Sequence, residues 1–94
     1  MKFQGKTALI TGSGTGIGKA IATKFVENGA SVIILGRRKE PLEEASKDLE
    51  QIISEKNSGA SVKIFAGVDV ADESAMNAMF DAIKNDNVNV DYII

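Results

Sequence analysis

The sequence predicts an α/β fold, with one domain over residues 1–94 built on a doubly wound parallel β-sheet. Two observations lead to this fold class. Short apolar runs alternate with longer segments whose apolar residues recur at helical spacing, so the element order is β-α-β-α-β-α-β. The apolar runs also lack polar alternation, which is typical of strands that helices cover on both faces. Such a sheet is parallel, with right-handed crossover connections.

The first two predicted strands are Lys6–Thr11 and Ser31–Gly36, since both are short runs rich in strand-forming residues. Gly29 stands where the helix between them would end, because glycine is common just after a helix C-terminus. The apolar positions of that helix lie three or four residues apart: Ile17, Ala20, Ile21 and Phe25.

Two more helix–strand pairs follow. A long helix is predicted from Pro41, which suits a first turn, to a break at Ser58–Gly59, and Val62–Val68 is the third strand. Asp72 is predicted to cap the next helix. A short polar turn then leads to the fourth strand, Val90–Ile94. The apolar positions of the last helix are Met76, Met79, Phe80 and Ile83.

The composition excludes several classes of site and partner. Hydrophobic residues make up 44% of the chain, which suits a globular core. The absence of cysteine and histidine excludes disulfides and thiolate metal sites and removes the commonest general base, so no metal site is expected. A net charge of −2 argues against nucleic-acid binding. With neither a signal peptide nor an apolar stretch of membrane-spanning length, a cytoplasmic location without membrane contact is expected.

The glycines between the first strand and the first helix form a candidate phosphate-binding loop. Two common glycine motifs do not fit. A P-loop would need glycine at Ser13 and a hydroxyl residue at Ala20. The G-x-G-x-x-G fingerprint, started at Gly12 or Gly14, ends on residues other than glycine.

The pattern T-G-x-x-x-G-x-G does fit, with its glycines at Gly12, Gly16 and Gly18. Gly12 lets the chain turn off the strand, Gly16 lets a pyrophosphate approach the backbone, and Gly18 allows close packing of the helix on the sheet. The helix N-terminus would offer the phosphates unpaired N–H groups and a partial positive charge.

The stretch "TGSGTGIG" resembles the cofactor loop of the short-chain dehydrogenases/reductases, a family of NAD(P)-dependent oxidoreductases. Three further markers come in the family's order: "GRR" after the second strand, "VDV" after the third and "VDYII" as the fourth. The resemblance implies a Rossmann-type sheet with strand order 3-2-1-4. It also implies that this chain is the N-terminal, cofactor-binding portion of a larger fold, cut after the fourth strand.

The residues after the second strand favour NADP(H) over NAD(H). Gly36 stands where an acidic residue would bind the ribose 2′-hydroxyl of NAD. Arg37 is predicted to hold the 2′-phosphate, and Arg38 either assists it or stacks on the adenine. By resemblance, the Asp69 side chain and the Val70 backbone N–H contact the adenine, although Asp69 could instead cap its loop. The predicted loop contacts are Gly12, Ser13, Thr15, Gly16, Ile17 and Gly18.

The family's catalytic serine and Tyr-x-x-x-Lys motif have no counterpart in these 94 residues. Tyr92 is the single tyrosine, and two residues follow it. The resemblance implies that the whole protein transfers hydride to or from a carbonyl, alcohol or enoyl group, and that this portion alone is inactive. The alternatives are a non-catalytic NADP-binding regulatory module and a structural α/β domain whose glycine loop is empty.

Two expectations concern partners. The resemblance implies a small-molecule substrate and a homodimer or homotetramer for the whole protein. The fourth strand, "VDYII", is predicted to be an exposed apolar edge of the sheet.

Overall fold

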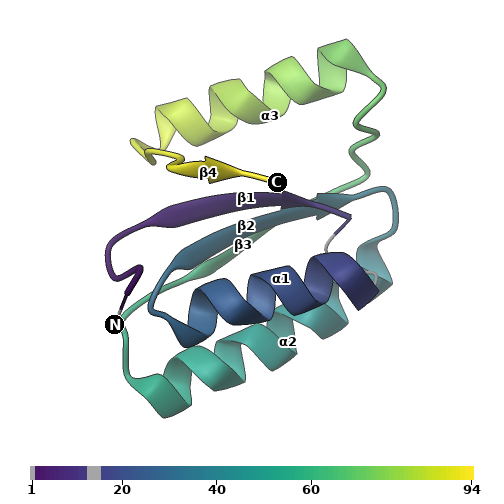
Figure 1. Cartoon of the computed structure of the whole chain (residues 1–94). Helices are drawn as coiled ribbons and strands as arrows, with labels where there is room; N and C mark the ends of the chain where they lie inside the picture. Colours follow the sequence, from purple (N-terminus) through teal and green to yellow (C-terminus); the bar gives the residue numbers. More distant parts are fainter. Residues whose placement is uncertain (1, 13–15) are drawn as a thin grey trace.

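A computed structural model describes residues 2–12 and 16–94 and shows a four-stranded parallel sheet in the order β3-β2-β1-β4 (Figure 1). The predicted α/β class and the strand order 3-2-1-4 are confirmed. The strands are β1 (Thr7–Thr11), β2 (Ser31–Gly36), β3 (Val62–Ala66) and β4 (Tyr92–Ile93). The predicted ends of the third and fourth strands were too generous, because β3 stops before Gly67, which has a φ of 74°, and β4 has two residues.

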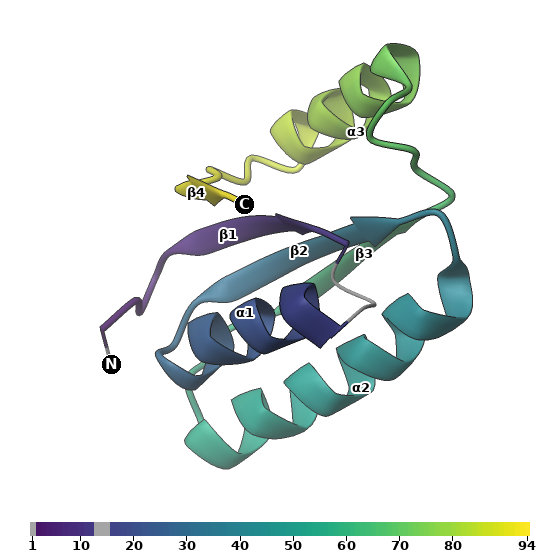
Figure 2. The same cartoon turned by 45° about the vertical axis from the view of Figure 1, so that its right-hand side comes forward.

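The helices lie on both faces of the sheet. Helices α1 (Gly16–Glu27) and α2 (Lys39–Lys56) cover one face, and α3 (Glu73–Asn85) lies on the other, as the two views show (Figures 1 and 2). Alternate residues of the strands therefore enter two separate cores. Ile10 and Ile34 pack in the core under α1 and α2, whereas Leu9 and Ile33 pack in the smaller core under α3.

Helix α2 differs slightly from its predicted bounds. It begins at Lys39, so Pro41 is its third residue and still lies in the first turn, where a missing N–H leaves no helical bond unmade. The helix ends at Lys56, two residues before the predicted break, because Asn57 takes a left-handed conformation with a φ of 52°. Asparagine is one of the residues that tolerate this conformation.

Asp72 caps α3 as predicted. Its side chain accepts a hydrogen bond from the N–H of Ala75 at 3.2 Å. We therefore expect Asp72→Ala to lower the free energy of unfolding by about 0.5–2 kcal/mol, the usual loss for an N-cap. Urea denaturation measures this loss. Asp81→Ala, an exposed acid within the same helix, is the control and should change stability far less. Equal losses in both variants would contradict the capping role.

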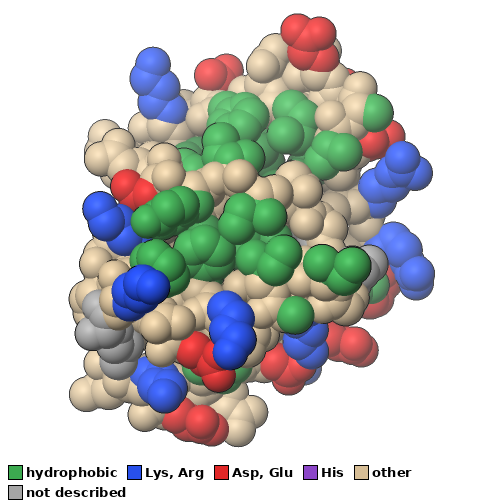
Figure 3. Space-filling model, viewed as in Figure 1, with side chains coloured by type: hydrophobic (Ala, Val, Ile, Leu, Met, Phe, Trp, Pro, Cys, Tyr) green, Lys and Arg blue, Asp and Glu red, His purple; other side chains and the backbone are tan. Residues whose placement is uncertain are grey.

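The fourth strand forms an exposed edge, as predicted. Tyr92 is 38% exposed and Ile93 is 66% exposed. Figure 3 shows apolar side chains gathered on this side of the molecule, over α3 and β4. Asp91 anchors the start of the strand, because its carboxylate accepts the N–H of Thr7 at 2.9 Å. The expectation of strands covered on both faces is wrong for β3, whose residues are half-buried or exposed.

Candidate functional site

The carboxyl ends of β1, β2 and β3 meet at one edge of the sheet and bring the predicted site residues together. Gly12 follows β1 with a φ of 65°, a conformation that favours glycine. Arg37 follows β2 directly, and Asp69 follows β3 after a short turn. Crevices at the carboxyl ends of parallel strands are the usual ligand sites of open α/β sheets. Ser13 and Thr15 lie outside the described residues, so their contacts stay predictions.

Gly16 opens helix α1 with free space beside it. A Cβ built on Gly16 would meet nothing within 4 Å, and its φ is not in the left-handed region. Nothing in the surrounding described structure therefore requires glycine at this position. The first turn of α1 carries no acidic residue, so no side-chain charge in the helix opposes an anion at its N-terminus.

The next two residues of α1, Ile17 and Gly18, differ in exposure. Ile17 is 80% exposed, whereas Gly18 is buried on the same stripe of the helix as Ala22 and Val26. The burial of Gly18 agrees with its predicted packing role. The exposure of Ile17 leaves its backbone N–H as the part of the residue suited to a phosphate.

A pocket of about 360 Å³ lies between the end of β1 and the start of α2. Its lining is mostly apolar, and the lining residues are Gly12, Leu35, Gly36, Arg37, Arg38, Pro41 and Leu42. The volume falls within the range of small-molecule sites, and a largely apolar wall is typical of such sites. The pocket therefore suits a flat apolar ring.

The fold does not require glycine at position 36, so a ligand rather than packing could determine which residue stands at the end of β2. A Cβ at Gly36 would lie 3.7 Å from the Cδ2 atom of Leu42, an ordinary van der Waals contact. Its φ is not in the left-handed region, so the fold does not demand glycine here. Arg38 takes the N-cap position of α2 without a side-chain capping bond. Among the described residues, Arg38 forms no ion pair.

Arg37 and Asp69 form an ion pair that sequence reasoning did not anticipate. The Nη2 atom of Arg37 lies 3.2 Å from the Oδ2 atom of Asp69. The other carboxylate oxygen, Oδ1, accepts the N–H of Ala71 at 2.9 Å. Asp69 thus does brace its own loop, the alternative role considered for it, while Asp72 caps α3. Val70 is 57% exposed at the same edge. The available signal was two opposite charges placed just after neighbouring strands.

Tyr92 has a structural environment. Its ring lies 5.7 Å from that of Phe3 and 5.4 Å from that of Phe25, centroid to centroid, at distances typical of aromatic pairs. This aromatic cluster fastens the N-terminal segment to α1 and β4. The ring of Tyr92 therefore contributes to packing.

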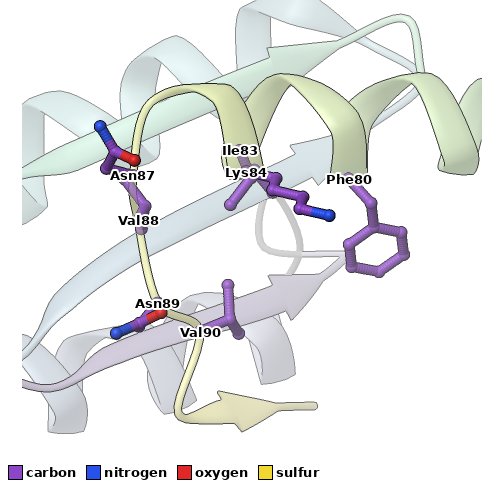
Figure 4. A pocket seen from close by; sticks show the side chains of 7 residues that line it. All are labelled: Phe80, Ile83, Lys84, Asn87, Val88, Asn89 and Val90. Carbon is purple, nitrogen blue, oxygen red and sulfur yellow. The ribbon is translucent and has the colours of Figure 1, made fainter.

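A second pocket, of about 510 Å³, lies between α3 and the segment that leads to β4 (Figure 4). Its lining is mixed, with a single charged side chain, that of Lys84: the residues are Phe80, Ile83, Lys84, Asn87, Val88, Asn89 and Val90. It contains none of the predicted site residues. Within residues 2–12 and 16–94, no group of three His, Cys, Asp or Glu side chains could hold a metal ion. No helix in the same ranges is long and apolar enough to cross a membrane.

Comparison with known proteins gives consistent matches. A probable 2,4-dienoyl-CoA reductase from Caenorhabditis elegans is 42% identical over 81 residues, which is 86% of this chain and 24% of that protein. The structure of L-sorbose reductase from Gluconobacter frateurii with NADPH and L-sorbose superposes with a TM-score of 0.82 at 33% identity. An NAD⁺-bound xylitol dehydrogenase gives 0.83 at 29% identity.

These matches cover nearly all of this chain but a minor part of each relative. The two structures are covered over 34% and 33% of their length, against 99% of this chain. The chain thus spans about a quarter to a third of the proteins it matches. The family described as short chain dehydrogenase matches residues 6–94. By sequence, by strand order and by the placement of its glycine loop, the chain belongs to the short chain dehydrogenase family.

Proposed function

We propose that this chain binds the adenosine and pyrophosphate portion of NADP(H), in preference to NAD(H). The whole protein would then be an NADP(H)-dependent oxidoreductase that acts on a carbonyl, alcohol or enoyl group of a small molecule. The observation that carries the proposal is the pocket beside Gly36. Arg37 and Arg38 are among the residues that line it, and no acidic residue stands at the end of β2. An anionic 2′-phosphate would pair with these arginines, whereas the uncharged 2′-hydroxyl of NAD needs no cationic partner.

Each predicted residue has a place in the proposed complex. The backbone N–H groups at the start of α1 would hold the pyrophosphate, with Gly16 keeping the approach open. Arg37 would bind the 2′-phosphate, and Arg38 would assist it or stack on the adenine. Asp69 and the N–H of Val70 would contact the adenine edge. The remaining predicted loop contacts are Gly12, Ser13, Thr15, Ile17 and Gly18.

The cofactor, when bound, supplies the hydride of the reaction. The residues of this chain bind and orient it. This sequence contains no Tyr-x-x-x-Lys pattern, so in this proposal residues outside this segment would transfer the proton. Small-molecule substrate binding and assembly into a homodimer or homotetramer belong to the same proposal.

The named relatives support a proposal in which this segment binds the cofactor and other parts of the whole protein bind the substrate. They differ in their substrates, from a dienoyl thioester to a sugar and a polyol, yet all match this segment. What they share here is therefore more naturally the cofactor than the substrate. One matched structure contains NADPH and another contains NAD⁺, so the preference for NADP rests on Gly36 and Arg37.

Reversing the charge of Arg37 tests the proposed preference. Arg37→Asp removes a charge-assisted bond to the 2′-phosphate, worth about 1.5–3 kcal/mol, so affinity for NADP⁺ should fall roughly ten- to a hundredfold. NAD⁺ binding should change little or improve. Isothermal titration with both dinucleotides gives the ratio. The control is Lys47→Asp, the same charge change at an exposed site in the middle of α2. Equal loss for both dinucleotides would contradict the assignment of Arg37.

A further inference from the structure

We propose that Asp69 limits the preference for NADP by competing with the 2′-phosphate for Arg37. Asp69 pairs with the guanidinium group that the 2′-phosphate would need. Asp69 is thereby a specificity-determining residue, in addition to its proposed contact with the adenine. This inference rests on the proposed function of the site.

The fold fixes this pair at the edge of the sheet. Strands β2 and β3 are parallel neighbours, with Gly36 beside Ala66. The N–H of Val68 donates to the carbonyl oxygen of Gly36 at 3.1 Å and holds the two strand ends together beyond the ladder. Arg37 and Asp69 are each one residue past these anchoring groups. Their meeting thus follows from strand register, so the pair is built into the fold.

The two partners differ in how firmly they are held. Asp69 is the fixed partner, because its second oxygen is bound to the Ala71 N–H at 2.9 Å and 60% of its side chain is covered. The Arg37 side chain is 75% exposed and forms its ion pair with Asp69. Arg37 is therefore the group that must turn or be shared when an anion arrives.

A 2′-phosphate and the Asp69 carboxylate would accept hydrogen bonds from the same N–H groups of Arg37. Both are anionic acceptors, and a guanidinium presents its N–H groups as a planar fork that suits one such anion at a time on each edge. If the phosphate displaces the carboxylate, the ion pair is lost. If Arg37 keeps both, two anions lie close together and repel each other. In either case, Asp69 weakens binding of the 2′-phosphate. Exposed ion pairs of this kind are worth a factor of about two to five in an equilibrium constant.

Two nucleotide probes isolate this effect. 2′,5′-ADP and 5′-AMP share adenine, ribose and the 5′-phosphate, and they differ in the 2′-phosphate alone. The ratio of their affinities therefore reports on the contact with Arg37 and cancels the contact with adenine. Asp69→Asn removes the negative charge but keeps a carbonyl oxygen for the Ala71 N–H. We expect this variant to raise the ratio in favour of 2′,5′-ADP about two- to fivefold.

A double-mutant cycle shows whether Arg37 carries the effect. The same Asp69→Asn change, made in an Arg37→Met background, should leave the ratio unaltered. Asp86→Asn is the matched control, because it breaks an ion pair with Lys63 elsewhere on the sheet and should leave the ratio as in the unmodified chain. An unchanged or lowered ratio in Asp69→Asn would overturn the inference. An equal rise with and without Arg37 would also overturn it, because the effect would then be general repulsion.

A measurement without ligand separates this inference from the proposed function. The Arg37 Nη–H signals in a ¹⁵N–¹H NMR spectrum should exchange with water more slowly in the unmodified chain than in Asp69→Asn, because Nη2 is the atom that faces Asp69. Equal exchange rates would show that the pair is absent in solution and overturn the inference, whatever the chain binds. Equal affinity of the unmodified chain for 2′,5′-ADP and 5′-AMP would overturn the NADP preference instead, and the exchange rates would still decide the ion pair.

Discussion

Replacing Gly16 by valine should abolish most dinucleotide binding while leaving the fold intact. A Cβ at this position enters open space and the backbone there is not left-handed, so no described neighbour opposes the side chain. Valine would instead fill the space through which a pyrophosphate reaches the N–H groups at the start of α1. The loss of two charge-assisted hydrogen bonds, about 1.5–3 kcal/mol each, corresponds to a fall in affinity of about a hundredfold or more.

Thermal denaturation and titration of the same samples separate the two effects. The melting temperature should stay within a few degrees of the unmodified chain, since glycine inside a helix is itself unfavourable by about 0.5–1 kcal/mol relative to alanine. Ala20→Val, which adds a similar side chain at an exposed position one turn further along α1, should keep binding. Normal NADP⁺ affinity in Gly16→Val would mean that the glycine loop is a structural connection and holds no phosphate.

The fold could be predicted from local sequence patterns, because the spacing of apolar residues reflects which positions are buried. The runs Thr7–Thr11 and Ser31–Gly36 are apolar on both sides, and their central residues are indeed buried on both sides. The same reasoning overestimated the burial of β3, whose residues are half-buried or exposed. A strand's sequence shows that its side chains are apolar, but its position at the edge of a sheet depends on which other strands and helices lie beside it.

The candidate site was predictable in its backbone features and less so in its side-chain contacts. Gly12 could be predicted from the sequence, since its left-handed φ of 65° favours glycine, whereas the pyrophosphate contact at Gly16 stays a prediction. The Arg37–Asp69 pair could not be derived from the sequence. It depends on the register between β2 and β3 and on a loop whose hydrogen bonds turn the carboxylate toward β2. An ion pair between two surface residues produces no periodic sequence pattern from which it could be predicted.

The core under α1 and α2 should dominate stability, and Ile34→Ala tests this. Ile34 is fully buried on β2, between β1 and β3, and belongs to the larger of the two cores. Loss of its side chain leaves a cavity that fixed helices on one side and a sheet on the other cannot close. Such substitutions cost about 2–5 kcal/mol. A domain of this size has about 5–14 kcal/mol in total, so the loss is a large fraction of its stability.

Urea denaturation of three variants, Ile34→Ala, Ile34→Val and Ile93→Ala, compares the loss of stability at a buried and at an exposed isoleucine. Ile34→Val removes one methylene and should cost about 0.5–1.5 kcal/mol. Ile93→Ala removes a side chain that is 66% exposed on β4 and should cost about 0.5 kcal/mol or less. A loss in Ile93→Ala as large as that in Ile34→Ala would show that the β4 edge is buried in solution. The exposed apolar edge would then be covered by another copy of the chain, and the unfolding midpoint of every variant would rise with protein concentration.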